Sequence, residues 1–298
     1  MSTLPNARPG QSGREIPRRG ITVPEILSKK ARGEKITCLT AYDYPTARVV
    51  DEAGVDIILV GDSLAMVVLG QENTLAVTME EMLHHTRAVR RGVQRALLVA
   101  DMPFGSFQLD LNAAVANAIR FVKEAGAEAV KIEGGEKRLE LIGKLVENDI
   151  PVMGHIGLTP QSIHALGGFK MQGKTLAAAE QLLRDARAVE AAGAFSLVLE
   201  SIPVEVAERI TGEVRIPTIG IGAGPACDGQ VLVLHDLIGL SFAVQPRFAR
   251  RYADLRAALE QAVRGFCADV VKGDFPGEAE TSHLPPEVRE QWLATRAR

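Results

Sequence analysis

Three carboxylate residues follow the same local pattern at separate places in the chain. In each case Ala-Gly is followed by a short, mostly apolar run that ends in an acid. The acids are Asp62, Glu133 and Glu200. A glycine that closes a helix before a strand is the repeating joint of a βα protein, so these acids fall at the C-terminal ends of parallel strands. In a (β/α)8 barrel active sites are built at that end, and converging carboxylates there suggest a metal site with a base.

Two aspartates extend this pattern to neighbouring strands. Asp62 ends the run ILVGD, and Asp101 ends LLVAD just before Pro103. A single aspartate in such a place is equally well explained as a helix N-cap or a turn former. Two adjacent strands that both end in aspartate, followed by one that ends in Glu133, favour function, because carboxylates on one rim repel each other unless a cation lies among them. Hard oxygen ligands suit Mg²⁺.

Lys131 precedes Glu133 by two positions, so both side chains point to the same face of one strand. One interpretation is a pair of charges that neutralise each other near the end of the barrel. The functional interpretation is that Lys131 binds a carboxylate or oxo group of a substrate while Glu133 faces the metal.

Glu200 follows the apolar residues 197–199. A carboxylate in such surroundings is poorly solvated, which makes it a better base near neutral pH; the alternative is a buried glutamate paired with an arginine. His155 ends another strand and either contacts a substrate or is a structural histidine. Residues 220–224 (GIGAG) either bind phosphate through backbone N–H groups or form a tight turn.

Strand-like and helix-like segments alternate along the chain. The strand candidates are residues 36–40, 55–61, 96–101, 128–132, 151–155, 195–200, 216–221 and 237–242. The helix candidates are residues 43–53, 79–92, 111–125, 136–148, 174–192, 203–212 and 227–236. Most strand candidates are continuous apolar runs, which is typical of parallel strands covered on both faces. This alternation predicts an α/β fold, a (β/α)8 TIM barrel with extra N- and C-terminal segments.

The main rival fold, an open doubly wound sheet, requires fewer strands and a glycine fingerprint after the first one. The first strand instead leads into TAYDYPTA, which contains no glycine. Two long loops, residues 62–78 and 156–173, follow strand ends and are expected over the open end of the barrel as lid or substrate-binding segments. The segment after residue 245 has helical periodicity and is expected to pack outside the barrel.

Composition bounds the remaining possibilities. With 298 residues, 46% of them hydrophobic, the chain can bury one large core, and we expect a flexible extension at 1–20, a single catalytic domain at 21–275 and a tail at 276–298. A net charge of −3 argues against nucleic-acid and membrane-surface partners. Three widely spaced cysteines predict neither disulfides nor a cysteine metal site and suit a cytoplasmic location. Neither a signal peptide nor a membrane span is expected.

Several motifs together resemble the ketopantoate hydroxymethyltransferase (3-methyl-2-oxobutanoate hydroxymethyltransferase) family. They are TAYDYPTA (40–47), VGDSL (60–64), VRRG (89–92), ADMPF (100–104), VKIEGG (130–135), GHIGLTPQS (154–162), LVLESIP (197–203), IPTIGIGAG (216–224), DGQVLVLHD (228–236) and RRYADL (250–255). The resemblance covers residues 21 to 275. It departs at Ala76, where the family usually has proline, and it is poor at 239–245 and in the first twenty residues.

The resemblance implies an enzyme of pantothenate (coenzyme A precursor) biosynthesis. Its members transfer a hydroxymethyl group from 5,10-methylenetetrahydrofolate to 3-methyl-2-oxobutanoate (α-ketoisovalerate) through a Mg-stabilised enolate, and the product is 2-dehydropantoate (ketopantoate). They assemble as decamers in the cytoplasm. The implied roles are Mg²⁺ binding by Asp62, Asp101 and Glu133, ketoacid binding by Asp62, Ser63, Asp101 and Lys131, and proton acceptance by Glu200. The folate-binding residues are not legible.

Two rival functions remain at this point. A barrel like phosphoenolpyruvate mutase or isocitrate lyase performs Mg²⁺-enolate chemistry on other 2-oxo acids, but such barrels typically use a catalytic cysteine or a mobile lid rich in lysine and cysteine. None of the cysteines here is expected at a strand end that faces the open end of the barrel. A non-catalytic ligand-binding barrel is the other rival, and the joint presence of Glu200 with both aspartates speaks against it.

Overall fold

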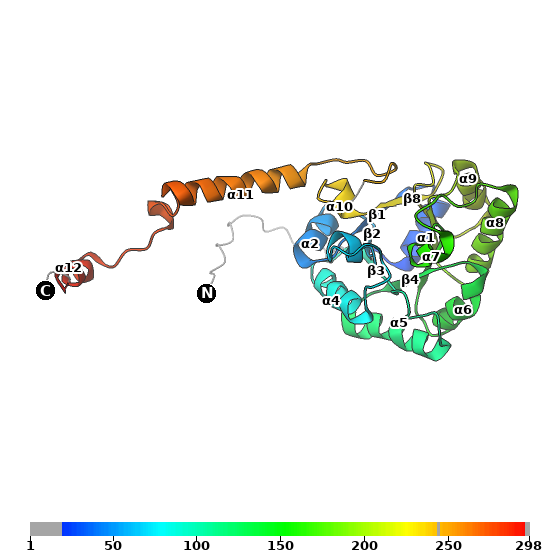
Figure 1. The fold of residues 1–298 in the computed structure, drawn as a ribbon. Coiled ribbons are helices and arrows are strands. Elements are labelled where there is room, and N and C mark those ends of the chain that lie inside the picture. The colour runs from blue at the N-terminus through cyan, green and yellow to red at the C-terminus, as the bar shows by residue number, and fades with distance from the viewer. Residues whose placement is uncertain (1–19, 243–244, 296–298) are drawn as a thin grey trace. The chain divides into compact units, whose positions relative to one another are not determined.

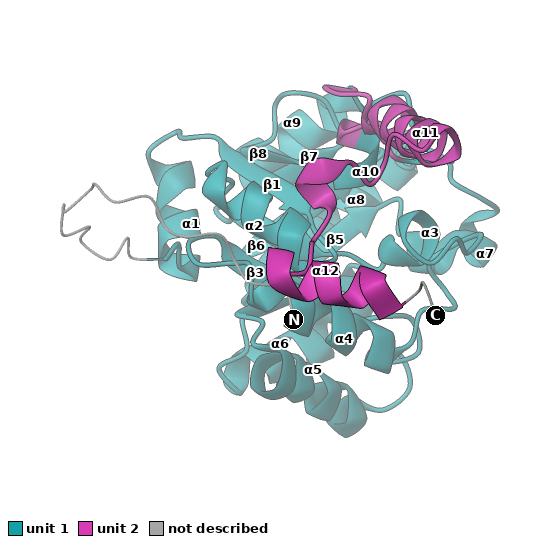
Figure 2. Ribbon diagram, turned by 90° about the vertical axis from the view of Figure 1, so that its left-hand side faces the viewer, with its two compact units in different colours: residues 1–236, 241–250 teal, residues 237–240, 251–298 magenta. Residues whose placement is uncertain are grey.

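The computed structural model describes residues 20–242 and 245–295. The predicted flexible extension at 1–20 therefore lies outside the described residues, except for Gly20. The chain divides into two compact units, residues 1–236 with 241–250 and residues 237–240 with 251–298 (Figure 2). The first unit contains the barrel and all the predicted site residues.

Within the described residues, eight parallel strands close into a barrel in the order of the sequence (Figure 1). They are β1 (Ile36–Thr40), β2 (Ile57–Val60), β3 (Leu97–Asp101), β4 (Ala129–Glu133), β5 (Val152–Gly157), β6 (Ser196–Glu200), β7 (Thr218–Ile221) and β8 (Gly229–Leu232). Pairing of β8 with β1 closes the ring, with Cys38 opposite Val231. The predicted (β/α)8 TIM barrel is confirmed. We call the C-terminal ends of its strands the mouth.

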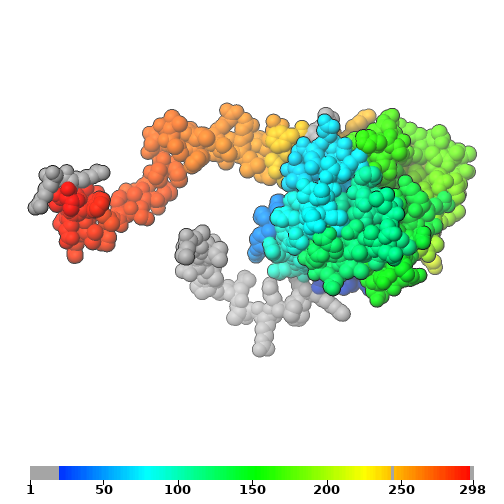
Figure 3. Space-filling view, turned by 60° about the horizontal axis from the view of Figure 1, so that its bottom comes forward, coloured from blue at the N-terminus to red at the C-terminus, as the bar shows by residue number. Residues whose placement is uncertain are grey.

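Helices connect most of the strands, and one more helix follows the last strand. They are α2 (Tyr44–Glu52), α3 (Leu64–Val67), α4 (Met79–Arg90), α5 (Leu111–Ala125), α6 (Leu139–Glu147), α7 (Ile163–Leu166), α8 (Leu176–Ala191), α9 (Val204–Glu213) and α10 (Leu234–Leu237). Short 3₁₀ turns, η1 (Glu136–Arg138) and η2 (Pro160–Ser162), precede α6 and α7. Helices α4, α5 and α6 contact each other in sequence and form part of a continuous outer layer (Figure 3).

Local sequence signals explain where several helices begin and end. The Asp110 side chain accepts a hydrogen bond from the Ala113 N–H at the start of α5, and Gly126 ends that helix in a left-handed conformation. Thr78 and Glu81 form a reciprocal capping box at the start of α4. These caps are readable in the sequence, which is why the predicted bounds of α5 match the observed ones.

The predicted last strand at 237–242 and the helix at 227–236 are wrong. The strand lies earlier, as β8 at Gly229–Leu232, and α10 follows it. A short apolar run cannot be assigned to strand or helix from periodicity alone, and VLVLHDLIGL offers both choices. Tertiary contact decides the matter: a Cβ atom at Gly229 would lie 2.5 Å from the Ile36 carbonyl oxygen, so only glycine allows this backbone to pair with β1.

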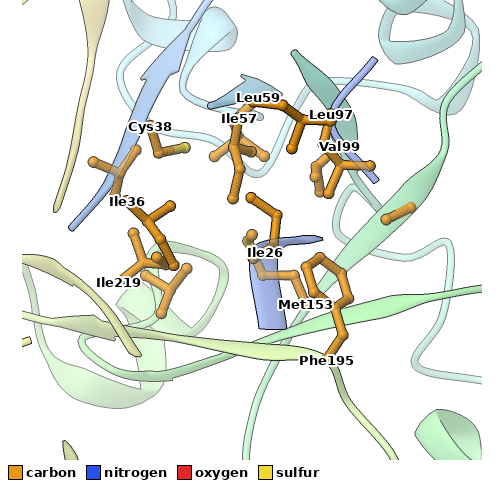
Figure 4. Packing of buried hydrophobic residues seen from close by; sticks show 14 residues of the cluster. Ile26, Ile36, Cys38, Ile57, Leu59, Leu97, Val99, Met153, Phe195 and Ile219 are labelled. Atoms are coloured by element: carbon orange, nitrogen blue, oxygen red, sulfur yellow. The ribbon is translucent and has the colours of Figure 1, made fainter. Parts of the chain in front are cut away.

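Helix α1 (Val23–Ala31) contributes to the barrel core, and the sequence alone did not indicate this. Its Ile26 is fully buried and packs among inward-facing residues of the strands, including Ile57, Met153 and Ile219 (Figure 4). Complete burial of one such side chain contributes about 1.5–3 kcal/mol of stability. The two lysines that follow, Lys29 and Lys30, reach carboxylates next to the N-terminal ends of the strands.

The second unit contains α11 (Leu255–Lys272), a 3₁₀ turn η3 (Glu278–Glu280) and α12 (Pro286–Ala294). Helix α11 confirms the helical periodicity after residue 245, and α12 lies within the predicted tail at 276–298. Apolar side chains of α11 that are exposed, among them Leu259, Val263 and Val270, recur three or four positions apart. Packing of this segment outside the barrel stays a prediction.

Candidate active site

Strand register brings the predicted site residues together at the mouth. Asp101 on β3 lies opposite Lys131 on β4, and Glu133, two residues further along β4, lies opposite His155 on β5. Glu200 is the last residue of β6 and pairs with the end of β5. Parallel pairing of neighbouring strands therefore places residues from distant parts of the chain side by side. The predicted convergence of these residues is confirmed.

Asp62 and Asp101 form a buried pair of carboxylates. The Asp62 backbone N–H donates a hydrogen bond to Asp101 Oδ2 over 3.0 Å, and each residue is less than 5% exposed. Burial, with repulsion from Asp101 and Glu133, raises the pKa of Asp62 well above its ordinary value. Burial also raises the pKa of Asp101, although the nearby Lys131 opposes the shift. Two acids held this close are stabilised by any positive charge placed beside them.

Lys131 supplies one such charge. Its Nζ lies 2.9 Å from Asp101 Oδ1, so Asp101 is its ion-pair partner. The interpretation of Lys131 and Glu133 as a neutralising pair had assumed a different partner. Burial lowers the pKa of Lys131, but the facing carboxylates of Asp101, Glu133 and Asp62 outweigh burial and raise it above the ordinary value. The ammonium therefore stays charged near neutral pH and can bind an anionic group.

His155 connects the acids on the opposite side of the mouth. Its Nε2 lies 3.2 Å from Glu200 Oε2, and its Nδ1 lies 3.6 Å from Glu133 Oε1. Burial and Lys131 lower the pKa of His155, whereas contacts with Glu133 and Glu200 raise it to about 9 overall. Glu200 is thus partnered by His155 rather than by the arginine of the alternative interpretation. Its side chain remains 15% exposed, more than those of the other site acids.

Glu133 is held in its ionised form despite burial. Burial raises the pKa of Glu133, but His155, Lys131 and the Gln161 backbone N–H lower it below the ordinary value overall. The Gln161 N–H donates to Glu133 Oε2 over 3.0 Å. Glu133 is therefore a carboxylate with a fixed orientation that faces the cationic groups of the mouth.

Ser63 lies beside the acidic pair on the side of β1. Its Oγ is 2.8 Å from the hydroxyl of Tyr42, either of which can be the donor. Tyr42 is buried, burial raises its pKa, and its backbone carbonyl oxygen lies 2.6 Å from His85 Nδ1. His85 thus has the packing role that its helical context suggests. Ser63 and Tyr42 form an uncharged, hydrogen-bonding wall next to Asp62.

The residues at the mouth meet some of the requirements of a divalent-cation site. In the described part of the chain, Asp101 Oδ1 and Glu133 Oε1 are buried without a hydrogen bond of good geometry. No group of three or more His, Cys, Asp or Glu side chains among those residues is arranged to hold a metal ion. Mg²⁺ in enzymes commonly uses only one or two protein carboxylates together with water and substrate oxygens. The donor set suits such an open site, and the predicted ligands Asp62, Asp101 and Glu133 stay predictions.

The glycine-rich segment 220–224 is shaped by close packing. Gly222 and Gly224 have positive φ angles of 63° and 82°. Cβ atoms there would lie 2.7 Å from the Phe248 ring and 2.6 Å from Val204. These contacts and φ angles explain why glycine is needed in a tight turn at these positions. The expectation that the segment binds phosphate stays a prediction.

The family described as ketopantoate hydroxymethyltransferase matches residues 20–278. A protein of Koribacter versatilis (strain Ellin345) named 3-methyl-2-oxobutanoate hydroxymethyltransferase is 59% identical over 272 residues, which is 91% of this chain and 92% of that protein. This chain belongs to the ketopantoate hydroxymethyltransferase family. The matched region includes every predicted site residue.

Solved structures outside this family share the fold. A phosphonopyruvate hydrolase has a TM-score of 0.57 at 16% identity and covers 93% of this chain and 99% of its own. A 2,3-dimethylmalate lyase, a PEP mutase/isocitrate lyase superfamily member, has a TM-score of 0.52 at 17% identity and covers 92% of this chain and 95% of its own. At this identity the likeness concerns the fold alone. No helix in the described residues is long and apolar enough to cross a membrane.

Two residues that contact the site of this family member were not singled out in the sequence. Gln161, in η2, contacts Asp62 and Glu133, and Tyr42 contacts Ser63. Gln161 lies in the motif GHIGLTPQS and Tyr42 in TAYDYPTA, and both motifs match the family. Their presence in these motifs was the one sequence feature that could have indicated a role at the site. Their chemistry is not evident from residue type, because a glutamine or a tyrosine in a loop has many ordinary roles.

Proposed function

We propose that this chain transfers a hydroxymethyl group from 5,10-methylenetetrahydrofolate to 3-methyl-2-oxobutanoate and so forms 2-dehydropantoate for pantothenate biosynthesis. The observation that carries the proposal is the division of the mouth into two sides. On one side lie Asp62, Asp101 and Lys131, which suit the charged end of a 2-oxo acid with a cation. On the other side Glu200 is held by His155 and is partly accessible.

The first side binds the ketoacid. The Lys131 ammonium attracts the substrate carboxylate or its keto oxygen, and Ser63 offers a hydroxyl hydrogen bond beside it. Asp62 and Asp101, with Glu133 nearby, would hold Mg²⁺. When bound, that ion would stabilise the negative charge that the keto oxygen gains as the C3 proton leaves.

Glu200 is the proton acceptor in the proposal. Its carboxylate takes the C3 proton of the ketoacid, and the electron pair of that C–H bond forms the C2–C3 double bond of the enolate. His155 Nε2 lies 3.2 Å from Glu200 Oε2, so the imidazole holds one oxygen by charge and leaves the other for the substrate. A positioned general base contributes about 10²–10⁴-fold to such a step.

The second half of the reaction needs the folate and water. The enolate carbon attacks the methylene carbon of the co-substrate, so that a C–C bond forms while one of the two C–N bonds of that carbon breaks, and the released nitrogen takes up the proton that Glu200 had accepted. Water then replaces the second folate nitrogen on that carbon: its hydroxyl stays on the product as the hydroxymethyl group, and its proton goes to that nitrogen. The net balance is ketoacid, methylenetetrahydrofolate and water giving 2-dehydropantoate and tetrahydrofolate.

Proton exchange tests the first half directly. The protein is incubated with 3-methyl-2-oxobutanoate and Mg²⁺ in D₂O, and the C3 proton is followed by NMR. We expect exchange that requires Mg²⁺ and is lost in Glu200→Gln. Because some enzymes enolise only when both substrates are bound, the experiment is repeated with tetrahydrofolate present. An absence of exchange in both conditions contradicts the proposed function.

We also propose that the chain works as a cytoplasmic homo-oligomer, with the decamer of the family as the specific expectation. The exposed apolar row on α11 supports self-association, because apolar side chains at helical spacing are normally buried. The free cysteines Cys38, Cys227 and Cys267 are consistent with a reducing compartment. Native mass spectrometry gives the subunit number, and a monomer at micromolar concentration contradicts this part of the proposal.

A further inference from the structure

Gln161 is the point where the loops of four neighbouring strands meet. It lies in η2 after β5 and is only 7% exposed. Its backbone N–H donates to Glu133 Oε2, which lies at the end of β4. Its side chain reaches Asp62 after β2 and the Met102 carbonyl oxygen after β3. A single neutral residue therefore contacts both ends of the acidic cluster at the mouth, Glu133 through its backbone and Asp62 through its side chain.

Every hydrogen-bonding group of this side chain is used. Nε2 donates to Asp62 Oδ2 and to the Met102 carbonyl oxygen, both over 2.9 Å, and Oε1 accepts from Gln108 Nε2 over 3.2 Å. A flipped amide would place Oε1 against two acceptors and Nε2 against a donor. The orientation of the amide is therefore determined by its surroundings.

This contact acts on a carboxylate whose surroundings are otherwise mainly acidic. Burial and the facing Asp101 and Glu133 disfavour the charge on Asp62, and the amide N–H opposes that effect without adding a competing cation. It also occupies Oδ2, and no hydrogen bond to Oδ1 is found among the described residues. One oxygen of Asp62 is thus anchored and the other is left for a ligand.

We propose that Gln161 is a positioning residue, whose amide sets the orientation of Asp62 for binding of a divalent cation with the 2-oxo acid. The inference rests on the proposed function and adds a residue to it. Hydrogen-bond partners of ligating carboxylates typically change metal affinity by about 10–100-fold when they are removed. We expect Gln161 to affect the binding of the cation rather than proton transfer, because its hydrogen bonds in the described residues reach neither Glu200 nor His155.

The test compares Gln161→Met with Gln172→Met. The first variant keeps side-chain size and the backbone contact to Glu133 but removes both donors to Asp62 and Met102. The control residue lies in the same loop, and its amide donates only to the Lys170 carbonyl oxygen. Calorimetry with Mg²⁺ alone is expected to show about 10–100-fold weaker binding for Gln161→Met and wild-type binding for the control.

Kinetics separate positioning from a merely structural role. For Gln161→Met we expect a raised KM for the ketoacid and for Mg²⁺, with kcat recovered at saturating Mg²⁺, because an interaction that acts on binding is restored by excess ligand. Gln161→Asn is expected to behave in the same way, since the shorter side chain cannot reach Asp62. Wild-type Mg²⁺ affinity in Gln161→Met, or a loss of kcat that saturation does not restore, overturns the proposal.

A second variant keeps the test decisive if Gln161→Met fails to fold. Gln108→Met removes the hydrogen bond to Gln161 Oε1, together with those that Gln108 Oε1 accepts from the Gly105 and Phe107 N–H groups, and leaves both donors of Gln161 in place. Its effect on Mg²⁺ affinity is expected to have the same sign as that of Gln161→Met and to be smaller. An unchanged affinity in that variant also counts against the proposal. Failure of the proposed function can be distinguished from failure of this inference. In that case Mg²⁺ binding would depend on Gln161, and yet the wild-type protein would show no exchange of the C3 proton of the ketoacid.

Discussion

The two ends of the barrel use buried carboxylates in opposite ways. At the N-terminal end, Asp56 Oδ2 accepts hydrogen bonds from the backbone N–H and the hydroxyl of Thr37, and Oδ1 lies 2.6 Å from Lys29 Nζ. Asp228 repeats this arrangement with Thr218, and Lys30 Nζ lies 2.9 Å from its Oδ2. Each of these acids has its own donors and its own lysine, and consecutive residues of α1 supply both lysines.

At the mouth the acids face each other. Asp62 and Asp101 share a single lysine, and both Asp101 Oδ1 and Glu133 Oε1 lack a hydrogen bond of good geometry in the described part of the chain. Burial raises the pKa of Asp56 as well, but its lysine and threonine donors lower it below the ordinary value overall. The pKa of Asp62 moves the other way. The comparison shows that the partners of a buried acid, together with the depth of its burial, distinguish the stabilising end from the reactive end.

Glu200→Gln should give the largest functional effect of a mouth substitution. Turnover is expected to fall by about 10²–10⁴-fold, because the amide cannot accept the C3 proton, while ketoacid binding is kept. The midpoint of thermal unfolding should change little. Steady-state kinetics and calorimetry on the same sample measure both quantities. A kcat equal to that of the wild type would rule out Glu200 as the base.

Asp62→Asn should separate ligand binding from stability. Mg²⁺ affinity is expected to drop by about 100-fold, since a charged oxygen donor is lost. In the absence of Mg²⁺ the variant should be at least as stable as the wild type, because repulsion with Asp101 is relieved. Metal titration and urea unfolding in EDTA test the two halves. Unchanged Mg²⁺ affinity would remove Asp62 from the site.

Asp56→Ala should show the reverse behaviour at the N-terminal end. We expect a loss of about 3 kcal/mol in the free energy of unfolding, because the largely buried Lys29 loses its partner, with kcat unchanged for the folded fraction. Glu34→Ala is the matched control, since its pair with Arg32 is solvent-exposed and contributes little to stability. Similar losses in the two variants would contradict the comparison.

The pH dependence of the free energy of unfolding should have opposite signs for Asp56 and Asp62. We expect this effect to be the smallest of the four predictions. The lowered pKa of Asp56 means that its contribution is present above the ordinary value of 3.8 and is lost as pH falls through the folded-state pKa. The raised pKa of Asp62 means that its ionisation destabilises the fold increasingly as pH rises above 3.8.

Urea unfolding of Asp56→Asn and Asp62→Asn in EDTA, across the acid range, measures these signs. The stability difference between wild type and Asp56→Asn should shrink toward low pH. For Asp62→Asn, the advantage over the wild type should grow toward neutral pH. Parallel pH profiles for the two variants would show that the two ends do not differ in the proposed way.

The fold class and the position of the acids were determined by the sequence itself. Repeated Ala-Gly joints and apolar runs of strand length are local signals, and the caps at Asp110 and Gly126 delimit a helix without reference to the rest of the chain. An acid at the end of a parallel strand must lie at the mouth, whatever the details of packing. This is why Glu133 and Glu200 were found from their spacing after Ala-Gly, and Asp101 from its place at the end of the run LLVAD.

Tertiary structure decided what the spacing left open. It placed β8 at Gly229–Leu232 through close contact with β1, paired Lys131 with Asp101 rather than Glu133, and gave Glu200 a histidine partner. It also brought Gln161 to Asp62, which lies 99 positions earlier in the chain. These outcomes depend on strand register and loop packing between distant segments. No local propensity encodes them, because each becomes defined only when the barrel closes.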